Sequence, residues 1–450
     1  LKIKLVSIIM SLSNSVRTHL LDPVQHNNNR TSFRIPDGFY ASSMKLVDLG
    51  VFDSALTATQ GAFYPSITGV MSCVRNIYLY SDSTLIDSLQ NCEQYASVEA
   101  LKTSNQGSMD LNNQLLLNGM GLRGQSANQP APTGTRITDK SQVGSMQLQG
   151  MSYGANKINN VDALNNQVNI ANAQENQSGS VLLSRYLQFL ESVSLLPMIP
   201  DLRIVFEWNT QKTTYYDDPD IGTTGALNLA VIRPTLIIDE VLGVDPTEAE
   251  QYDLPFLSTI VERFPVDAVT NGGGGSADHT NVPKRASFKS QAFTQKYLKD
   301  IMFYNQPSSD LAVANRWLTR GTRSVAQKGE VLQLVVNNVN HLPDQGITSP
   351  AQKLHYFNDT QSQLNLPLAS ATYGLTDASG NVLGKSAEPL LGQFSVTACK
   401  VGATVNDLRI EYQRLYGTNA SSRDAFTLLA FGTVAKTLSK GADGRVRVSY

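Results

Sequence analysis

Two glycine-rich motifs have a spacing close to that of nucleotide-binding loops. Gly119-Met-Gly-Leu-Arg-Gly124 matches Gly-x-Gly-x-x-Gly, which places backbone amides against a pyrophosphate when it follows a strand and opens a helix. This copy lies in a polar segment without the required strand and helix around it. Gly380 to Ser386 resembles a phosphate-binding loop, but its spacing is one residue short, and a hairpin turn is the better interpretation. We expect neither motif to bind a nucleotide.

Side chains that could carry out hydrolysis or bind a metal are scattered along the chain. The sequence contains no Gly-x-Ser-x-Gly motif, and sequence alone cannot bring any of its histidines together with a serine and an acid in the fold. Asp217-Asp218-Pro219-Asp220 offers several carboxylates to calcium but lacks the spacing of a calcium loop, so an exposed turn is favoured. His26 and His279 are expected in solvent-exposed loops, and three histidines beside apolar residues are expected to be structural: His19, His341 and His355. The sequence predicts no catalytic residue, cofactor or metal site.

Cysteines and targeting signals give no indication of secretion. Cys73, Cys92 and Cys399 are odd in number and far apart, so we expect buried free thiols rather than disulfides or a zinc site. The apolar run in residues 1–9 is short for a signal peptide, and we expect it to be an upstream extension. No apolar stretch reaches the roughly 18 residues of a membrane span. Four asparagines lie in glycosylation motifs that would be used only if the chain entered the secretory pathway: Asn29, Asn176, Asn358 and Asn419.

The composition is that of a folded chain with almost no net charge. Of 450 residues, 41% are hydrophobic and 16% are charged, which is too apolar for a disordered chain. Lysine and arginine total 36 against 38 aspartate and glutamate residues, so no excess positive charge is available to neutralise phosphates. At roughly 150 residues per domain, the length suits two large β-type domains.

Alternation of apolar and polar residues with a period of two indicates antiparallel strands. In Leu202-Arg-Ile-Val-Phe-Glu-Trp208 the even-numbered residues form one apolar face, which we expect to be buried. Val446, Val448 and Tyr450 alternate with polar residues in the same manner and predict a closing strand. The protein is therefore expected to be mainly β.

A coarse repeat relates the two halves of the chain. Leu202 to Phe206 resembles Leu408 to Tyr412, with an arginine in the same phase. In each half an earlier strand leads through a polar turn towards a helix, through Ser81-Asp82-Ser83 in the first half and Asn337-Asn338 in the second. The first helix is expected to reach about Lys102, with an inner stripe of Leu85, Leu89, Cys92 and Ala96; the second is expected over 350–358. The order predicts two copies of one sandwich.

Long polar insertions and an N-terminal segment complete the chain. Residues from about 105 to 180 are rich in Asn, Gln, Ser and Gly, and residues 271–278 contain a glycine run. Such loops are usually functional or disordered, and contacts between subunits are one use for them. Near the N-terminus, Val16, Leu20 and Leu21 share one face of a helix, which predicts an amphipathic arm; packing on its own domain is the alternative.

Several segments, in their order along the chain, resemble one family of proteins. Gly69 to Tyr80, followed by Thr84-Leu-Ile-Asp87, is similar to the strand, turn and "ID" segment in the first jelly roll of double jelly-roll major capsid proteins of the adenovirus-like lineage. Leu195 to Pro200 resembles the Leu-Pro segment before a late strand of that domain. Three segments of the second half resemble strands of Polinton-like virus and virophage capsid proteins: Leu298–Tyr304, Leu332–Pro343 and Ala425–Tyr450.

The resemblance implies an all-β fold of two eight-stranded antiparallel jelly-roll sandwiches in tandem, with long loop insertions and a few short helices. It implies an N-terminal arm over residues 1–30 and a first jelly roll over 31–244, with the insertion at about 105–180. A second jelly roll over 245–450 would follow.

The resemblance also implies a function. Such chains form homotrimeric, pseudo-hexameric capsomers in the icosahedral shell of a double-stranded DNA virus, so a major capsid protein located in the virion and assembled inside the host cell is expected, not an enzyme. The implied partners are neighbouring capsomers, penton and minor capsid proteins and, in viruses that have one, an internal membrane. Sequence-specific nucleic-acid binding is not implied.

Two other functions fit a β-sandwich. A secreted or surface carbohydrate-binding protein would use exposed aromatic residues, for which Tyr215, Tyr216 and Trp317 could serve. A β-sandwich glycoside hydrolase would need paired carboxylates, and no two acidic residues stand out on alternating positions of one strand. Neither alternative accounts for the repeat.

Overall fold

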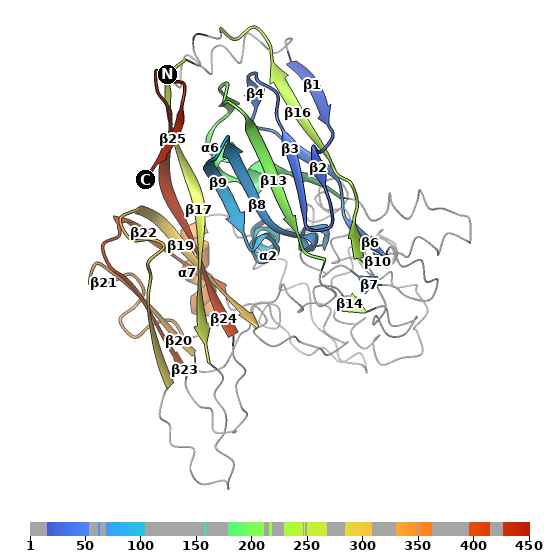
Figure 1. Ribbon diagram of the computed structural model, residues 1–450. Coiled ribbons are helices and arrows are strands. Elements are labelled where there is room, and N and C mark those ends of the chain that lie inside the picture. The colour runs from blue at the N-terminus through green and yellow to red at the C-terminus, as the bar shows by residue number, and fades with distance from the viewer. Residues whose placement is uncertain are drawn as a thin grey trace, which may run out of the picture.

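The computed structural model contains two antiparallel β-sandwiches that stand side by side (Figure 1). It describes residues 16–53, 62–63, 69–103, 157–158, 179–210, 216–217, 229–245, 247, 250–267, 284–307, 330–348, 350–361, 396–414 and 426–450. Strands dominate these residues, which confirms the expected all-β class.

The first sandwich consists of a six-stranded and a five-stranded sheet. The strands of the six-stranded sheet are β1 (Val16–Leu21), β4 (Tyr40–Ala41), β5 (Lys45–Leu49), β11 (Gly179–Leu182), β12 (Leu195–Leu196) and β16 (Thr235–Val241). Their order is β11-β5-β16-β4-β12, and β1 also pairs with β16. The five-stranded sheet contains β2 (Gln25–His26), β3 (Arg30–Arg34), β13 (Leu202–Trp208), β8 (Val74–Ser81) and β9 (Thr84–Gln90), in that order.

The second sandwich consists of a five-stranded and a four-stranded sheet. The five-stranded sheet contains β17 (Tyr252–Val266), β24 (Phe426–Lys440), β19 (Tyr297–Pro307) and β22 (Val396–Thr404) in that order, with β25 (Val446–Ser449) paired to β24. The four-stranded sheet contains β18 (Lys284–Lys289), β23 (Leu408–Arg414), β20 (Glu330–Val336) and β21 (Val339–Asn340) in that order.

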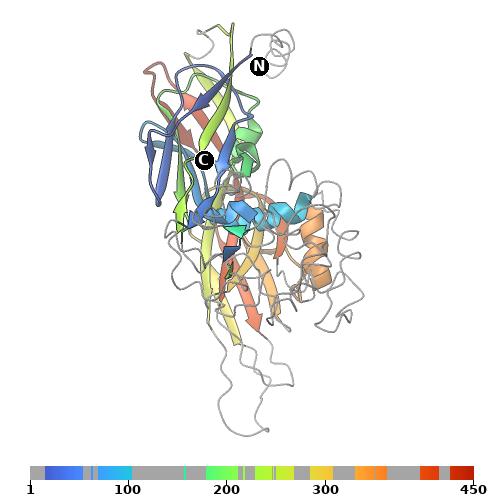
Figure 2. The ribbon, with the colours of Figure 1, turned by 90° about the vertical axis from the view of Figure 1, so that its right-hand side faces the viewer.

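Short helices and small strand pairs complete the described structure. The longer helices α2 (Cys92–Thr103) and α7 (Pro350–Gln361) lie on the same side of the molecule (Figure 2). The shorter helices are η1 (Gly69–Cys73), η6 (Leu183–Arg185) and α6 (Gln188–Ser192). The small strand groups are β6 (Val51–Asp53) with β15 (Leu229–Val231), and β7 (Ala62–Phe63) with β10 (Lys157–Ile158) and β14 (Tyr216–Asp217).

Each half of the chain repeats one pattern of strand pairing. The sheet order β1-β16-β5-β11 in the first half corresponds to β17-β24-β19-β22 in the second, and β3-β13-β8-β9 corresponds to β18-β23-β20-β21. In each set the first, third, sixth and eighth strands along the chain form one sheet, and the second, fourth, fifth and seventh form the other, which is the jelly-roll pattern. The expected pair of jelly rolls is confirmed, and helices α2 and α7 occupy the same position after the hairpins β8–β9 and β20–β21.

Buried apolar side chains fill both sandwiches. The predicted inner face of β13 is buried: Phe206 has no solvent exposure, meets the ring of Phe33 edge to face at 6.1 Å and stacks on Trp208 at 5.6 Å between ring centroids. Arg203 on the other face is exposed. One continuous apolar cluster fills the first sandwich and reaches residues of the second, and another fills the rest of the second.

The N-terminal segment is a strand, so the expectation of an amphipathic helix there is wrong. Val16 to Leu21 pairs with Val241 to Leu236 along its whole length. A strand places Leu21 towards the core, where it is partly buried, and leaves Val16 and Leu20 exposed. Helical spacing could not exclude this arrangement, because the partner strand lies more than 200 residues away in sequence.

The helix predicted before Lys102 begins later than its apolar stripe suggested. Leu85 and Leu89 belong to strand β9, and α2 begins at Cys92 after Asn91, whose φ is 57°. Strand and helix follow each other so closely that the apolar spacing continues through the boundary. The second helix and the closing strand, α7 and β25, are confirmed. Most of the insertion at about 105–180 lies outside the described residues.

Candidate functional site

The residues that the sequence singled out for chemistry do not come together in the described structure. Both glycine motifs, His279, Tyr215, Trp317, Asp218 and Asp220 lie outside the described residues. Among the residues that the structure does describe, no group of three or more His, Cys, Asp or Glu side chains is placed to hold a metal ion, and no helix is long and apolar enough to cross a membrane.

The described histidines make structural contacts. His19 Nε2 lies 2.7 Å from Glu240 Oε2 across the β1–β16 pair, and His26 Nδ1 lies 2.8 Å from Thr31 Oγ1. Burial lowers the pKa of His26, and the charge of Arg233 lowers it further. His341 Nδ1 lies 3.3 Å from the Lys400 carbonyl oxygen. His19 and His341 fit the structural interpretation, whereas His26 lies partly buried in strand β2 and not in the expected solvent-exposed loop.

The three cysteines are buried free thiols, as expected. Burial raises the pKa of Cys399 to about 12 and raises that of Cys73 and Cys92 above the ordinary thiol value. Thiols in this state are poor nucleophiles and do not react readily with oxidants. They act as small packing residues.

A group of ion pairs lies at the start of β13, the central strand of the five-stranded sheet in the first sandwich. Asp201, in the left-handed region at φ 45°, precedes β13 and pairs with Arg34 on β3, where Asp201 Oδ1 lies 2.9 Å from Arg34 Nε. Its other carboxylate oxygen pairs with Arg203 on β13. Arg203 and Arg34 are direct partners in the β3–β13 register. The carboxylate therefore fixes the ends of two neighbouring strands.

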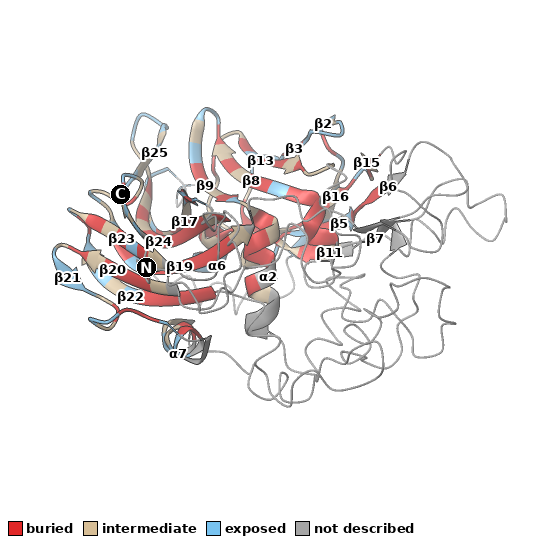
Figure 3. Cartoon of the chain, turned by 90° about the horizontal axis from the view of Figure 1, so that it is seen from below, coloured by how far each residue is buried: buried red, intermediate tan, exposed pale blue. Residues whose placement is uncertain are grey.

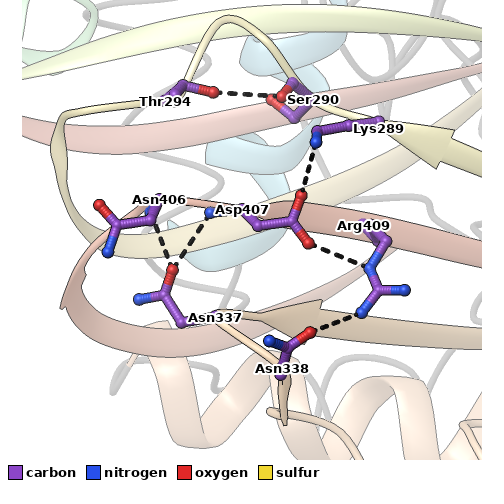
Figure 4. Close-up of polar contacts among 8 residues, drawn as sticks. All are labelled: Lys289, Ser290, Thr294, Asn337, Asn338, Asn406, Asp407 and Arg409. Atoms are coloured by element: carbon purple, nitrogen blue, oxygen red, sulfur yellow. Dashed lines mark hydrogen bonds and ion pairs between the residues drawn. The ribbon is translucent and has the colours of Figure 1, made fainter.

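The second sandwich repeats this group at the equivalent position (Figure 4). Asp407 precedes β23, and its carboxylate oxygens lie 3.1 Å from Lys289 Nζ on β18 and 3.1 Å from Arg409 Nε on β23. Lys289 and Arg409 are direct partners in the β18–β23 register. Arg409 also donates to Asn338 Oδ1 at 2.9 Å in the turn between β20 and β21.

We call the two groups the Asp-Leu-Arg clamps: Asp201 with Arg34 and Arg203, and Asp407 with Lys289 and Arg409. The repeat found in the sequence begins one residue after each aspartate, so it includes Arg203 and Arg409 but not Asp201 and Asp407. The full shared motif is Asp-Leu-Arg-Ile in both halves. The clamps are partly exposed, so their contribution to stability is modest. The two clamps occupy the same position in the two halves, at the start of the equivalent strands β13 and β23.

An apolar seam joins the two sandwiches. Phe189 on α6 meets Phe256 on β17 edge to face, with ring centroids 4.9 Å apart. Tyr95 on α2 lies 5.7 Å from the ring of Phe431 on β24. All four side chains are at most 6% exposed. Because one core cluster runs through the seam, we expect the two sandwiches to unfold together rather than as independent domains.

A buried carboxylate lies in the middle of the seam. Asp87 on β9 accepts hydrogen bonds from the Ser258 hydroxyl on β17 at 2.6 Å and from the Phe189 amide at 2.9 Å. Burial raises the pKa of Asp87, while these hydrogen bonds and the charge of Lys436 on β24 oppose the rise. Burial disfavours the charged form of Lys436 as well, and for a lysine this lowers the pKa. The hydrogen bond from Ser258 to Asp87 therefore links β17 of the second sandwich to β9 of the first.

Further contacts line the rim of the seam. Arg263 on β17 donates to Asn91 Oδ1 at 3.2 and 2.6 Å, and the Leu257 amide donates to Ser192 Oγ at 3.3 Å. Leu257 belongs to the outer edge of its sheet, so a side chain of the first sandwich partners an edge amide of the second. Strand edges of the two halves are thus joined within one chain.

Solved structures share this fold at very low sequence identity. A chain of the Sputnik virophage structure, determined by electron cryo-microscopy, matches with a TM-score of 0.57 and 10% identity, covering 97% of this chain and 88% of that one. The mavirus major capsid protein matches with a TM-score of 0.48 and 9% identity, covering 97% and 90%. No family model and no curated protein sequence matches the chain. The Sputnik likeness spans the whole double jelly roll.

Proposed function

We propose that the protein is the major capsid protein of an icosahedral double-stranded DNA virus and that it forms trimeric, pseudo-hexameric capsomers. The observation that carries the proposal is the duplication: two jelly rolls with matching strand order and matching Asp-Leu-Arg clamps stand side by side in one rigidly joined chain. Three such chains supply six similar units, which suits a lattice position with six neighbours. A virus particle contains a chain of the same fold.

The charge and chemistry of the chain support a structural role rather than an enzymatic one. A formal net charge of −2 lets many copies lie close together without strong mutual repulsion. Asp87, Asp201 and Asp407 are engaged in structural contacts of the seam and the clamps. We place the protein in the virion, assembled inside the host cell, with the other chains of the trimer and neighbouring capsomers as its partners.

The domain division also remains a proposal. We place the boundary between the jelly rolls at residues 244–245, because β16 ends at Val241 and β17 begins a different sheet at Tyr252. Penton proteins, minor capsid proteins and an internal membrane are proposed partners of the arm within residues 1–30. Deleting residues 1–15, which precede β1, should leave trimers intact and prevent closed shells. Loss of the trimer would contradict that role for the arm.

Light scattering on purified full-length protein, combined with a glycan-binding screen, tests the proposal against the carbohydrate-binding alternative. A stable trimer without glycan affinity is the expected result. A monomer that binds a glycan would overturn the capsid function and favour the alternative.

A further inference from the structure

Two lysines in the second sandwich share one tyrosine ring. Lys436 on β24 and Lys296, which lies just before β19, place their Nζ atoms 5.1 Å and 4.6 Å from the centroid of the Tyr450 ring. Each lysine lies two residues beyond the cross-strand pair of Leu298 and Val434, so the two are neighbours where the β19–β24 pairing ends. Strand β24 is largely buried and runs between β17 and β19 (Figure 3).

The ammonium group of Lys436 is buried without a hydrogen-bond acceptor. The residue is only 6% exposed, and among the described residues no acceptor or carboxylate oxygen lies within hydrogen-bond or ion-pair distance of its Nζ. An ammonium has three N–H donors, and buried donors in proteins are almost always paired. Lys296 donates to the Ala292 carbonyl oxygen, which leaves its other two donors open. The donors of both lysines therefore lie beside one ring with too few acceptors.

The two lysines lie near carboxylates that are bonded to other groups. Burial lowers the pKa of Lys436, and the charge of Lys296 lowers it further, while the charge of Asp87 opposes the shift. Burial also lowers the pKa of Lys296, and Glu262 opposes that shift. Asp87 accepts hydrogen bonds from one hydroxyl and two backbone amides, and Glu262 accepts from one hydroxyl and one backbone amide. Neither carboxylate pairs directly with a lysine, so the two like charges remain close together.

We propose that Lys436 and Lys296 bind a free, compact oxyanion of the phosphate or sulfate type. Water supplies acceptors but no charge, whereas an oxyanion supplies acceptors and also neutralises the two ammonium groups. Tyr450 is 61% exposed, so an ion can reach the lysines beside its ring, while the burial of Lys436 excludes a bulky ligand. Burial raises the pKa of Asp87, which favours its neutral form and weakens its repulsion of an anion.

The anion site lies next to the seam, so its occupation should stabilise the chain. Lys436 is the register partner of Phe256, whose ring meets Phe189 of the first sandwich. The Val446 carbonyl oxygen of β25 lies 3.5 Å from the Thr84 hydroxyl of β9. An anion bound here holds β24, the turn before β19 and the residue after β25 together on the second sandwich's side of the seam. A ligand that binds only the folded chain raises its stability.

Titration calorimetry of the full-length protein with inorganic phosphate, in a chloride buffer of constant ionic strength, tests the site. We expect one phosphate to bind per chain. Lys436→Met and Lys296→Met should each weaken binding about tenfold or more, because each removes a charge-assisted hydrogen bond. Lys299→Met is the matched control, since it removes the same charge from an exposed position on β19 and should leave the affinity unchanged. Equal phosphate affinity in all four proteins would overturn the site.

Thermal unfolding separates a specific site from a general effect of salt. Phosphate should raise the unfolding midpoint of the wild type and of Lys299→Met above its value in chloride of the same ionic strength, and it should raise the midpoints of the two site variants much less. Lys296 is only partly buried, so Lys296→Met gives the same test if Lys436→Met does not fold. Equal wild-type midpoints in phosphate and chloride would show that water alone pairs with the lysines, which overturns the proposal.

A single-stranded oligonucleotide distinguishes a free ion from the phosphate groups of a nucleic acid. Because Lys436 is buried, the oligonucleotide should leave the phosphate titration of the wild type unchanged. Displacement of phosphate by the oligonucleotide would overturn the assignment to a free ion. The anion site does not depend on the capsid function, which light scattering on the same protein tests separately.

Discussion

Glu93 is a buried carboxylate whose charged form the fold disfavours. Its oxygens accept hydrogen bonds from the side-chain amides of Gln94 and Asn209, the latter at 3.1 Å, at the start of α2. Burial raises the pKa of Glu93 to about 7, and the two amides and the charge of Arg75 only partly oppose it. The folded state therefore favours the protonated side chain.

Stability should depend on pH through this residue. A carboxyl whose folded pKa is raised stabilises the fold fully below its ordinary pKa, here 4.5, and loses that contribution as the pH rises through about 7. Urea unfolding of the wild type should lose up to about 3 kcal/mol across this interval relative to Glu93→Gln, which keeps the amide contacts without a titrating group. Parallel pH profiles of the two proteins would contradict the assignment.

Phe206 tests the packing of the first core. It has no solvent exposure and lies between the rings of Phe33 and Trp208. Phe206→Ala should cost about 3–5 kcal/mol through lost burial and a cavity, and thermal unfolding should show a sharply lower midpoint. Lys45→Ala, on an exposed position of β5, is the control and should change stability by no more than about 0.5 kcal/mol. An unchanged midpoint for Phe206→Ala would show that the strand phase is wrong.

At the scale of elements, the clamps tie the ends of equivalent strands in the two jelly rolls. Asp201→Asn and Asp407→Asn each weaken two ion pairs that are partly exposed, so each should cost only about 0.5–1.5 kcal/mol in urea unfolding. Equal losses are expected because the two groups hold the same position. If only one of the two variants lost stability, the two clamps would not contribute equally to the free energy of unfolding, and their equivalence would be contradicted.

The sequence predicted elements best where one face of a strand is buried. Alternation identified β13 and β25, and polar residues identified the turns after β8 and β20, because these signals are local; the strand β9 after the first turn was instead assigned to a helix. It misassigned Val16–Leu21, whose spacing also fits a helix and whose partner β16 is distant in sequence. The sequence identified Asp87 only as part of a motif. Nothing local shows that Ser258 donates a hydrogen bond to it across the seam or that the charge of Lys436 acts on it. Contacts between distant segments were therefore the part that pattern could not supply.

The seam makes the whole molecule one unit. Asp87→Ala leaves the Ser258 hydroxyl and the Phe189 amide without their acceptor in the seam and should lower the free energy of unfolding by about 1–3 kcal/mol for each lost hydrogen bond. Asp87→Asn keeps a carbonyl oxygen as an acceptor and should therefore lose less stability than Asp87→Ala. Calorimetry should show one transition for both sandwiches in the wild type. Two separated transitions would contradict the shared core.

Electron microscopy of the purified protein under reducing conditions tests directly whether the protein forms trimeric capsomers. We predict particles with a near-hexagonal outline, in which three chains place six sandwiches around one axis. The particles should survive reduction because all three cysteines are buried free thiols. Single two-lobed particles, or oligomers that fall apart on reduction, would contradict a trimeric capsomer assembled from double jelly rolls.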